Sequence, residues 1–194
     1  MSARSATTHR ETKETTIDLS LVVDGSGGAS ASTGIPFFDH MLEQIGKHGG
    51  FDLTIEATGD LEVDLHHTVE DVGIVLGAAL KEALGDKAGV RRFASSLVPL
   101  DEALVQVALD LSGRPFLVYE VDPIAEWIGT FDPQLMEEFW RAFTFAAGLT
   151  LHIRSLAGKN GHHVIEASCK GVARALRDAV WVEGTGVPST KGTL

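Results

Sequence analysis

The residues best suited to chemistry in this chain form one pattern that occurs twice. Two adjacent histidines are followed three residues later by a glutamate, at residues 66–70 and again at residues 162–166. Neutral imidazole and carboxylate groups together suit manganese, iron, cobalt, nickel or zinc. On a helix, the first histidine and the glutamate of each pattern would share one face, because residues four positions apart are neighbours there. The repeated pattern therefore predicts a metal-binding protein.

The second histidine of each motif must point away from that face, because one position along a helix is a rotation of about 100°. The simplest arrangement is two metal ions. Each ion takes a histidine and a glutamate from one motif and the remaining histidine from the other motif. One pair of adjacent histidines could equally be surface residues at a helix start, but two pairs with matching glutamates favour metal binding.

Both motifs are expected to begin helices. Apolar residues recur at helical spacing after each motif, so that one helix should run from residue 64 or 65 to a stop at Gly85 and the other over 161–182. Residues 1–16 are polar, and His9 is expected in a disordered tail. The other expected elements are strands over 16–23, 51–58, 103–111, 116–121 and 149–155, a flexible loop from residue 24, and helices over 37–47 and from Asp132-Pro133 to about residue 147. Strand 116–121 is predicted to be the hairpin partner of strand 103–111.

The order of these elements predicts an internal duplication. Residues 51–55 align with 149–153, and the Asp-x-Ser-Gly sequence at residue 24 aligns with the one at residue 110. The expected halves are residues 1–92 and 93–194, which form one compact unit. Two like halves related by an approximate twofold axis would place equivalent residues at equivalent metal ions.

The duplication also predicts a further ligand for each ion. The same alignment pairs His40 with Glu138. His40 could instead be a hydrogen-bonded core histidine and Glu138 a solvated charge, and whether Glu138 or His152 completes the second ion stays open. The predicted ligands are His40, His67, His162 and Glu166 for one ion, and His66, Glu70, Glu138 and His163 for the other.

A few basic groups stand out in an otherwise acidic chain. Each alone is normally solvated, but together they could neutralise a phosphate group. They are Arg91, Arg92, Arg114, Lys170 and the terminal sequence Ser189-Thr190-Lys191. Lys170 lies one helical turn beyond Glu166, where it can reach a ligand on the metal face. The glycine-rich run 184–188 predicts a C-terminal segment that closes over a site.

Two acids precede the first predicted strand of each half. Glu14 and Asp101 occupy nearly equivalent places in the repeat. Acids in such loops are usually solvated, but an unligated carboxylate beside a metal is also what proton transfer requires. His48, on the helix that carries His40, is a further candidate for a catalytic or substrate-facing residue.

The composition excludes several classes of protein. The chain has 194 residues, 44% of them hydrophobic and 22% charged, with a net charge of −11. Clustered lysine and arginine residues give nucleic-acid affinity, and there are too few here, so no nucleic-acid partner is expected. No apolar run is long enough to cross a membrane. The single cysteine, Cys169, excludes an internal disulfide and fits a reducing cytoplasm, so a cytoplasmic protein is expected.

These residues, in this order, closely resemble the imidazoleglycerol-phosphate dehydratase family of histidine biosynthesis. The motifs that carry the resemblance lie at residues 13–15, 32–42, 66–71, 99–103, 110–115, 158–163 and 188–192, and so span essentially the whole chain. The resemblance implies an α+β fold in which two similar βαβ-containing halves pack their helices between two mixed sheets. It also implies two manganese(II) ions per subunit, other divalent transition metals being possible, and a large closed homo-oligomer, a 24-mer in the family, with active sites between subunits.

The resemblance further implies a reaction and residue roles. Members of the family remove water from D-erythro-imidazole glycerol phosphate to give imidazole acetol phosphate, and we expect the ring to be held as an imidazolate between the ions and to pass through a diazafulvene-like intermediate. Glu14 is the expected proton-transfer residue, with His48 and Asp101 as further catalytic candidates. The expected substrate-binding residues are Glu14, Gln44, His48, Arg92, Arg114, Lys170, Ser189 and Lys191.

The chain departs from the family at one predicted ligand. Where members usually carry a histidine, it has Glu138. A carboxylate also binds manganese, so activity is expected to survive, and the property affected is the metal preference or affinity of that ion. Two rival functions fit the metal motif alone: another two-metal phosphoesterase or hydrolase, and a metal-storage assembly protein.

Overall fold

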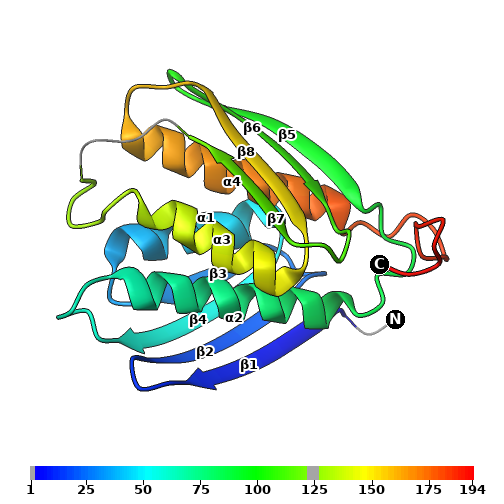
Figure 1. Ribbon diagram of the computed structural model, residues 1–194, viewed down its shortest axis with the longest axis horizontal. Coiled ribbons are helices and arrows are strands. Elements are labelled where there is room, and N and C mark those ends of the chain that lie inside the picture. Colours follow the sequence, from blue (N-terminus) through cyan, green and yellow to red (C-terminus); the bar gives the residue numbers. More distant parts are fainter. Residues whose placement is uncertain (1–2, 122–126) are drawn as a thin grey trace.

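Two four-stranded sheets enclose a layer of helices in the computed structural model, which describes residues 3–121 and 127–194 (Figure 1). The first half contains β1 (Ser5–Glu11), β2 (Thr15–Val22), β3 (Ala29–Ser32), α1 (Pro36–Gly49), β4 (Asp52–Gly59) and α2 (His66–Leu84). The second contains β5 (Phe93–Leu100), β6 (Ala103–Asp110), β7 (Phe116–Glu120), α3 (Leu135–Ala147), β8 (Thr150–Ala157) and α4 (Gly161–Ala179).

The two halves share one topology. The strand orders are β1-β2-β4-β3 and β5-β6-β8-β7. In each sheet the first three strands pair antiparallel and the fourth pairs parallel with its neighbour. Both sheets are therefore mixed, and the expected α+β fold with two similar halves and helices between the sheets is confirmed.

Three strands were not predicted, and all three expose much of their surface. The polar N-terminus is not a disordered tail, because residues 5–11 form β1 and His9 pairs with Asp18 of β2. In β1 the one buried residue is Ala6, and in β5 it is Val98. Such strands are held mainly by backbone hydrogen bonds and show no clear apolar alternation. The loop expected after residue 24 likewise contains β3.

The predicted hairpin partner of the strand over 103–111 is wrong. Strand β7 pairs parallel with β8, and β8 separates it from β6. The turn that contains Gly113 (φ +74°) does not form a tight hairpin. It starts a connection that passes the end of β8 and places β7 on the far side of that strand. Among the helices, α3 begins at Leu135, two residues after Pro133, and α4 ends at Ala179 before the predicted residue 182.

Helix packing sets the positions of the two motifs. Helix α1 packs against α4, and α2 packs closely against α3. A Cβ atom at Gly77 of α2 would lie 2.5 Å from the carbonyl oxygen of Phe143, and one at Gly73 would lie 2.7 Å from that of Phe139. The missing side chains let the two backbones touch. None of the helices in the described residues combines the length and apolar character needed to cross a membrane.

Candidate active site

Three of the predicted ligands meet where α1 crosses α4. His40 of α1 and His162 and Glu166 of α4 offer ligand atoms that all lie within 4.8 Å of one another. Nε2 of His162 is 3.0 Å and Nε2 of His40 is 3.8 Å from Oε2 of Glu166. Two imidazole nitrogens and a carboxylate oxygen at one point match the ligand preference of divalent manganese, iron and zinc. The residues present therefore fit a metal ion.

Lys170 holds the carboxylate of this cluster. Its Nζ lies 2.7 Å from Oε1 of Glu166, whose side chain is 13% exposed. Burial opposes ionisation of Glu166, but hydrogen bonding and charge from Lys170 keep its pKa below the ordinary value. Glu166 is therefore held as a carboxylate, the form that binds a metal ion.

A row of polar side chains continues from His40 along α1. Gln44 lies one turn on, with Nε2 3.5 Å from Nδ1 of His40, and its Oε1 is 3.1 Å from Nε2 of His48. Burial, followed by the charges of Lys170 and Arg174, lowers the pKa of His48. His48 is thus favoured in its neutral form, which can accept or donate one proton.

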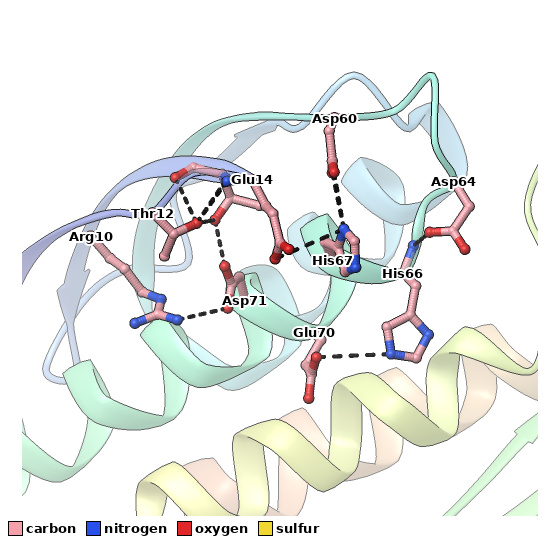
Figure 2. A network of polar contacts seen from close by, with 10 residues as sticks. Arg10, Thr12, Glu14, Asp60, Asp64, His66, His67, Glu70 and Asp71 are labelled. Carbon is pink, nitrogen blue, oxygen red and sulfur yellow. Dashed lines mark hydrogen bonds and ion pairs between the residues drawn. The ribbon is translucent and has the colours of Figure 1, made fainter.

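The second predicted pair is present at the start of α2. Nε2 of His66 lies 3.8 Å from Oε2 of Glu70, and the backbone N–H of His66 donates to Asp64 (Figure 2). Within the described residues, this pair is not joined by a third ligand atom of the same chain. Glu138, expected there by symmetry, pairs with Arg141 of its own helix at 3.4 Å. It remains a predicted ligand.

His152, the alternative to Glu138, faces away from the helices. Its neighbours Leu151 and Ile153 are fully buried. Because alternate side chains of a strand point to opposite faces, His152 lies on the outer face of the sheet. Of the two alternatives, Glu138 is thus the one on an inner helix.

The second histidine of each motif is held by a carboxylate. Nδ1 of His67 lies 3.0 Å from Oδ2 of Asp60 (Figure 2), and Nδ1 of His163 lies 2.8 Å from Oε2 of Glu102. These contacts raise the pKa values of both histidines and hold the pKa of Glu102 at about 2. A carboxylate on Nδ1 fixes the ring and leaves Nε2 for a metal ion. Neither histidine joins the cluster of its own chain that sequence symmetry assigned to it, so both remain predicted ligands.

Sequence reasoning missed Asp60 and Glu102. Both are acids that directly follow or precede a strand, but nothing in the sequence shows that they face a motif histidine. The two acids that were predicted lie beside them. Glu14 has Oε2 3.9 Å from Nδ1 of His67, and Asp101 has Oδ2 3.8 Å from Nε2 of His163.

The predicted phosphate-binding residues gather at the C-terminal tail. An open pocket of about 720 Å³ is lined by Arg92, Arg114 and residues 188–191. Arg92 donates to Asp110 through Nε (2.7 Å) and Nη2 (3.1 Å), and to the carbonyl of Pro188 through Nη1 (2.7 Å). Arg92 thus anchors the tail, while the side chain of Arg114, 68% exposed, remains available for an anion.

This pocket lies far from the metal-ligand candidates of the same chain. The backbone N–H of Arg92 donates to the carbonyl of Ala179, the last residue of α4. His162 is near the other end of α4, and the rise of an α-helix puts the two ends roughly 25 Å apart. Figure 1 shows the same separation, with the tail at one end of the molecule and the starts of α2 and α4 at the other. Within one chain, the tail pocket and the metal-ligand candidates are too far apart to contact the same small molecule.

Comparisons with known proteins identify the family to which the chain belongs. The family model described as imidazoleglycerol-phosphate dehydratase matches residues 33–176. Imidazoleglycerol-phosphate dehydratase from Acidothermus cellulolyticus is 59% identical over 192 residues, covering 98% of this chain and 93% of that protein. The protein of the same name from Parafrankia is 57% identical and covers 99% of this chain and 100% of its own length.

Solved structures show the same fold. The imidazoleglycerol-phosphate dehydratase of Staphylococcus aureus superposes with a TM-score of 0.83 at 39% identity, covering 92% of this chain and 99% of that chain. That of Pyrococcus furiosus superposes with a TM-score of 0.82 at 37% identity, covering 96% and 100%. The chain belongs to the imidazoleglycerol-phosphate dehydratase family and is a dehydratase.

Proposed function

We propose that the enzyme dehydrates D-erythro-imidazole glycerol phosphate to imidazole acetol phosphate at a centre of two divalent metal ions, manganese being the first candidate. The observation that carries this proposal is the meeting of His40, His162 and Glu166 at one point. The ions would be held by His40, His66, His67, Glu70, Glu138, His162, His163 and Glu166. When bound, such ions supply Lewis acidity toward the nitrogens of an imidazole ring.

Glu14 is the proposed proton-transfer residue. Dehydration removes a proton from one carbon and hydroxide from the next, and the enol that results becomes a ketone when a proton returns to carbon. Each step needs a group that can take up or give a proton beside the substrate. The carboxylate of Glu14 is 54% exposed and lies beside His67, so it can reach a substrate held at the metal ligands.

Two further residues are proposed to assist. His48 is favoured as neutral imidazole and lies next to Gln44, which suits a second acid/base or a contact to a substrate hydroxyl. Asp101 lies near His163 with its side chain 76% exposed. It is the weaker candidate, because Glu102 already holds that histidine.

The phosphate group is proposed to bind at the tail pocket. Arg114 and Lys191 supply exposed positive charge, and Ser189 supplies a hydroxyl. Arg92 holds the tail, and Gln44 and Lys170 would contact the substrate from the metal side. Fixing a remote phosphate helps to place the reacting carbon.

Each site is proposed to combine residues of more than one copy of the chain. Support comes from the distance between the tail pocket and the metal-ligand candidates, and from the partial exposure of His67 and His163 (34% and 28%). A large closed homo-oligomer, as the family resemblance implies, would bring the parts together. The single, buried cysteine fits work in a reducing compartment, and we propose the cytoplasm.

One assay separates this function from its rivals. The protein is stripped of metal with a chelator, returned to manganese and incubated with imidazole glycerol phosphate. The expected result is a keto product, two manganese ions per chain by mass spectrometry, and no activity without metal. Release of inorganic phosphate alone would instead identify a phosphoesterase, and many bound ions without turnover would identify a storage protein.

A further inference from the structure

The internal repeat makes Glu14 and Glu102 equivalent residues. Strands β2 and β6 both have eight residues and occupy the second place in their sheets, and they begin at Thr15 and Ala103. The residues directly before them are Glu14 and Glu102. Sequence reasoning placed Glu14 and Asp101 at nearly equivalent positions, and the strand starts show that the equivalent of Glu14 is Glu102.

In the second half, Glu102 is committed to holding a histidine. Its Oε2 lies 2.8 Å from Nδ1 of His163. Its Oε1 accepts the backbone N–H groups of Lys159 (3.2 Å) and Asn160 (2.8 Å). Both carboxylate oxygens are therefore occupied, and this acid is fixed in place.

In the first half, Asp60 takes that place. Nδ1 of His67 lies 3.0 and 3.2 Å from the two oxygens of Asp60, and 3.9 Å from the nearer oxygen of Glu14. Figure 2 shows Asp60 and Glu14 directed at the same ring nitrogen of His67 from different directions. Among the described residues, the Glu14 carboxylate accepts no hydrogen bond, and its ion-pair contact is the one with His67 at 3.9 Å.

The second half has no counterpart of the Asp60 side chain. Strands β4 and β8 end at Gly59 and Ala157, so the repeat equivalent of Asp60 is Gly158. Gly59 in turn lets the end of β4 lie directly on α2, because a Cβ atom there would lie 2.0 Å from Oγ1 of Thr68. The backbone N–H of Asp60 also donates to the carbonyl of Glu14 at 3.1 Å.

The loop that carries Glu14 is itself anchored. Arg10 donates to Asp71 at 3.0 Å, and Asp71 accepts the hydroxyl of Thr15 (Figure 2). The backbone N–H of Glu14 donates to Oγ1 of Thr12 at 3.1 Å. The backbone of Glu14 is thus fixed, while its carboxylate accepts no hydrogen bond among the described residues.

We propose that Asp60 is a positioning residue that orients His67 in place of Glu14 and so leaves the Glu14 carboxylate free for proton transfer. Of two equivalent glutamates, one is structural and the other is catalytic, and the aspartate present in one half makes the difference. This inference rests on the proposed role of Glu14 in the dehydration.

A double-mutant cycle tests the inference. With manganese saturating, Asp60→Ala should lower kcat about tenfold or more with little change in KM, because His67 then captures Glu14 and a general acid–base group contributes about 100-fold or more. In the Glu14→Ala background, Asp60→Ala should cause no further loss of kcat. Asp60→Glu should restore most of the rate. Equal losses of kcat in both backgrounds, or full activity of Asp60→Ala, would overturn the proposal.

Across the same variants, manganese affinity should show a pattern opposite to that of kcat. Each single alanine variant should bind manganese nearly as the original chain does, because one carboxylate remains for His67. The double variant should bind about 10- to 100-fold more weakly, as expected when the partner of a ligating histidine is lost. Calorimetry measures this without turnover. A double variant that binds manganese as tightly as the single variants would contradict the proposal that Glu14 replaces Asp60 as the partner of His67.

A crystal structure of the metal-free Asp60→Ala protein separates this inference from the proposed function. The Glu14 carboxylate should lie within hydrogen-bond distance of Nδ1 of His67, whether or not the enzyme dehydrates this substrate. If it does not, Asp60 is not what keeps the two apart. The matched control is Asp18→Ala, which removes a carboxylate 2.8 Å from Nδ1 of His9 on the exposed face of β1 and β2 and should leave kcat unchanged.

Discussion

Nε2 of His40 lies 3.8 Å from Oε2 of Glu166, and the two residues come from opposite halves of the duplicated chain. Helix α1 packs against α4, and α2 against α3, so each candidate metal position lies on a contact between the halves. An ion bound to His40 and Glu166 would join α1 to α4. Metal binding and docking of the two halves should therefore stabilise each other.

Glu166→Gln should remove the ion at the first cluster and most of the activity. An amide keeps the shape of the side chain but loses the charge that the ion needs. Loss of an indirect partner costs about 10- to 100-fold, so loss of a direct ligand should lower kcat/KM by more than about 100-fold with the fold intact. Mass spectrometry should find fewer manganese ions per chain, and manganese should raise Tm less than in the original protein. Glu82→Gln, a change at an exposed residue of α2, is the control, and full activity of Glu166→Gln with two ions retained would refute its role as a ligand.

Gly77→Ala tests the contact between α2 and α3 through the sign of the change in the free energy of unfolding. By helix propensity alone, alanine in place of glycine would stabilise a helix by about 1 kcal/mol. The new Cβ atom would instead lie 2.5 Å from the carbonyl oxygen of Phe143, in a backbone that cannot yield easily. We expect the free energy of unfolding in denaturant to fall by about 1–3 kcal/mol. Gly184→Ala, where the Cβ atom meets nothing within 4 Å, should change it little, and a more stable Gly77→Ala protein would show that the helices can separate at low cost.

Parts of this fold follow from local sequence and parts do not. Strand β2, with Ile17, Leu19 and Leu21 on its buried face, shows the alternation that reveals a strand. The exposed strands β1 and β5 form hairpins with the next strand along the chain, and β3 pairs with β4 across α1. None of the three buries one whole face, so none shows the apolar alternation that would report it. A turn between β6 and β7 suggested that these two strands form a hairpin. In the sheet, β8 lies between them and pairs parallel with β7, and no local sequence pattern reports this order.

The same division holds for the site. The contact between His162 and Glu166 follows from their spacing on a helix, and His40 follows from the duplication. The carboxylates beside His67 and His163 do not, because Asp60 and Glu102 meet them only through the packing of a loop on a helix start. The separation of the tail pocket from the metal ligands also appears only in three dimensions.

The buried side chain of Lys87 predicts a dependence of stability on pH. Lys87 is 6% exposed, its Nζ donates to the carbonyl of Leu111 at 3.1 Å, and burial lowers its pKa from the ordinary 10.5. Between the folded and unfolded pKa values the unfolded chain binds more protons, so stability rises with pH in that window. Because other groups also titrate there, the measurement is the difference in free energy of unfolding between the original protein and Lys87→Met. This difference should shift in favour of the original protein as the pH approaches 10.5, and a constant difference would argue against a desolvated ammonium group.

Arg114→Ala should weaken substrate binding without changing the chemistry. Arg114 is 68% exposed beside the tail, and its contact with Asp110 is long at 3.9 Å, so its donors remain free for a phosphate. Loss of a charge-assisted hydrogen bond should raise KM about tenfold or more while kcat stays nearly constant. Inorganic phosphate should also inhibit the variant less than the original enzyme. Arg154→Ala, which breaks an exposed pair with Glu120, is the control, and an unchanged KM for Arg114→Ala would move the phosphate site elsewhere.

Mixed assemblies test whether one metal position takes residues from two copies of the chain. His40→Ala and His67→Ala proteins should each be inactive, because each loses a predicted ligand of the same ion. If His67 reaches the cluster of a neighbouring copy, a His67→Ala chain still offers His40, His162 and Glu166, and a His40→Ala chain still offers His67. Co-assembly of the two inactive proteins then forms some intact positions, and part of the activity should return, with its maximum when the two proteins are mixed in equal amounts. Ligands drawn from a single copy would leave every mixture inactive, because neither chain then carries the full set.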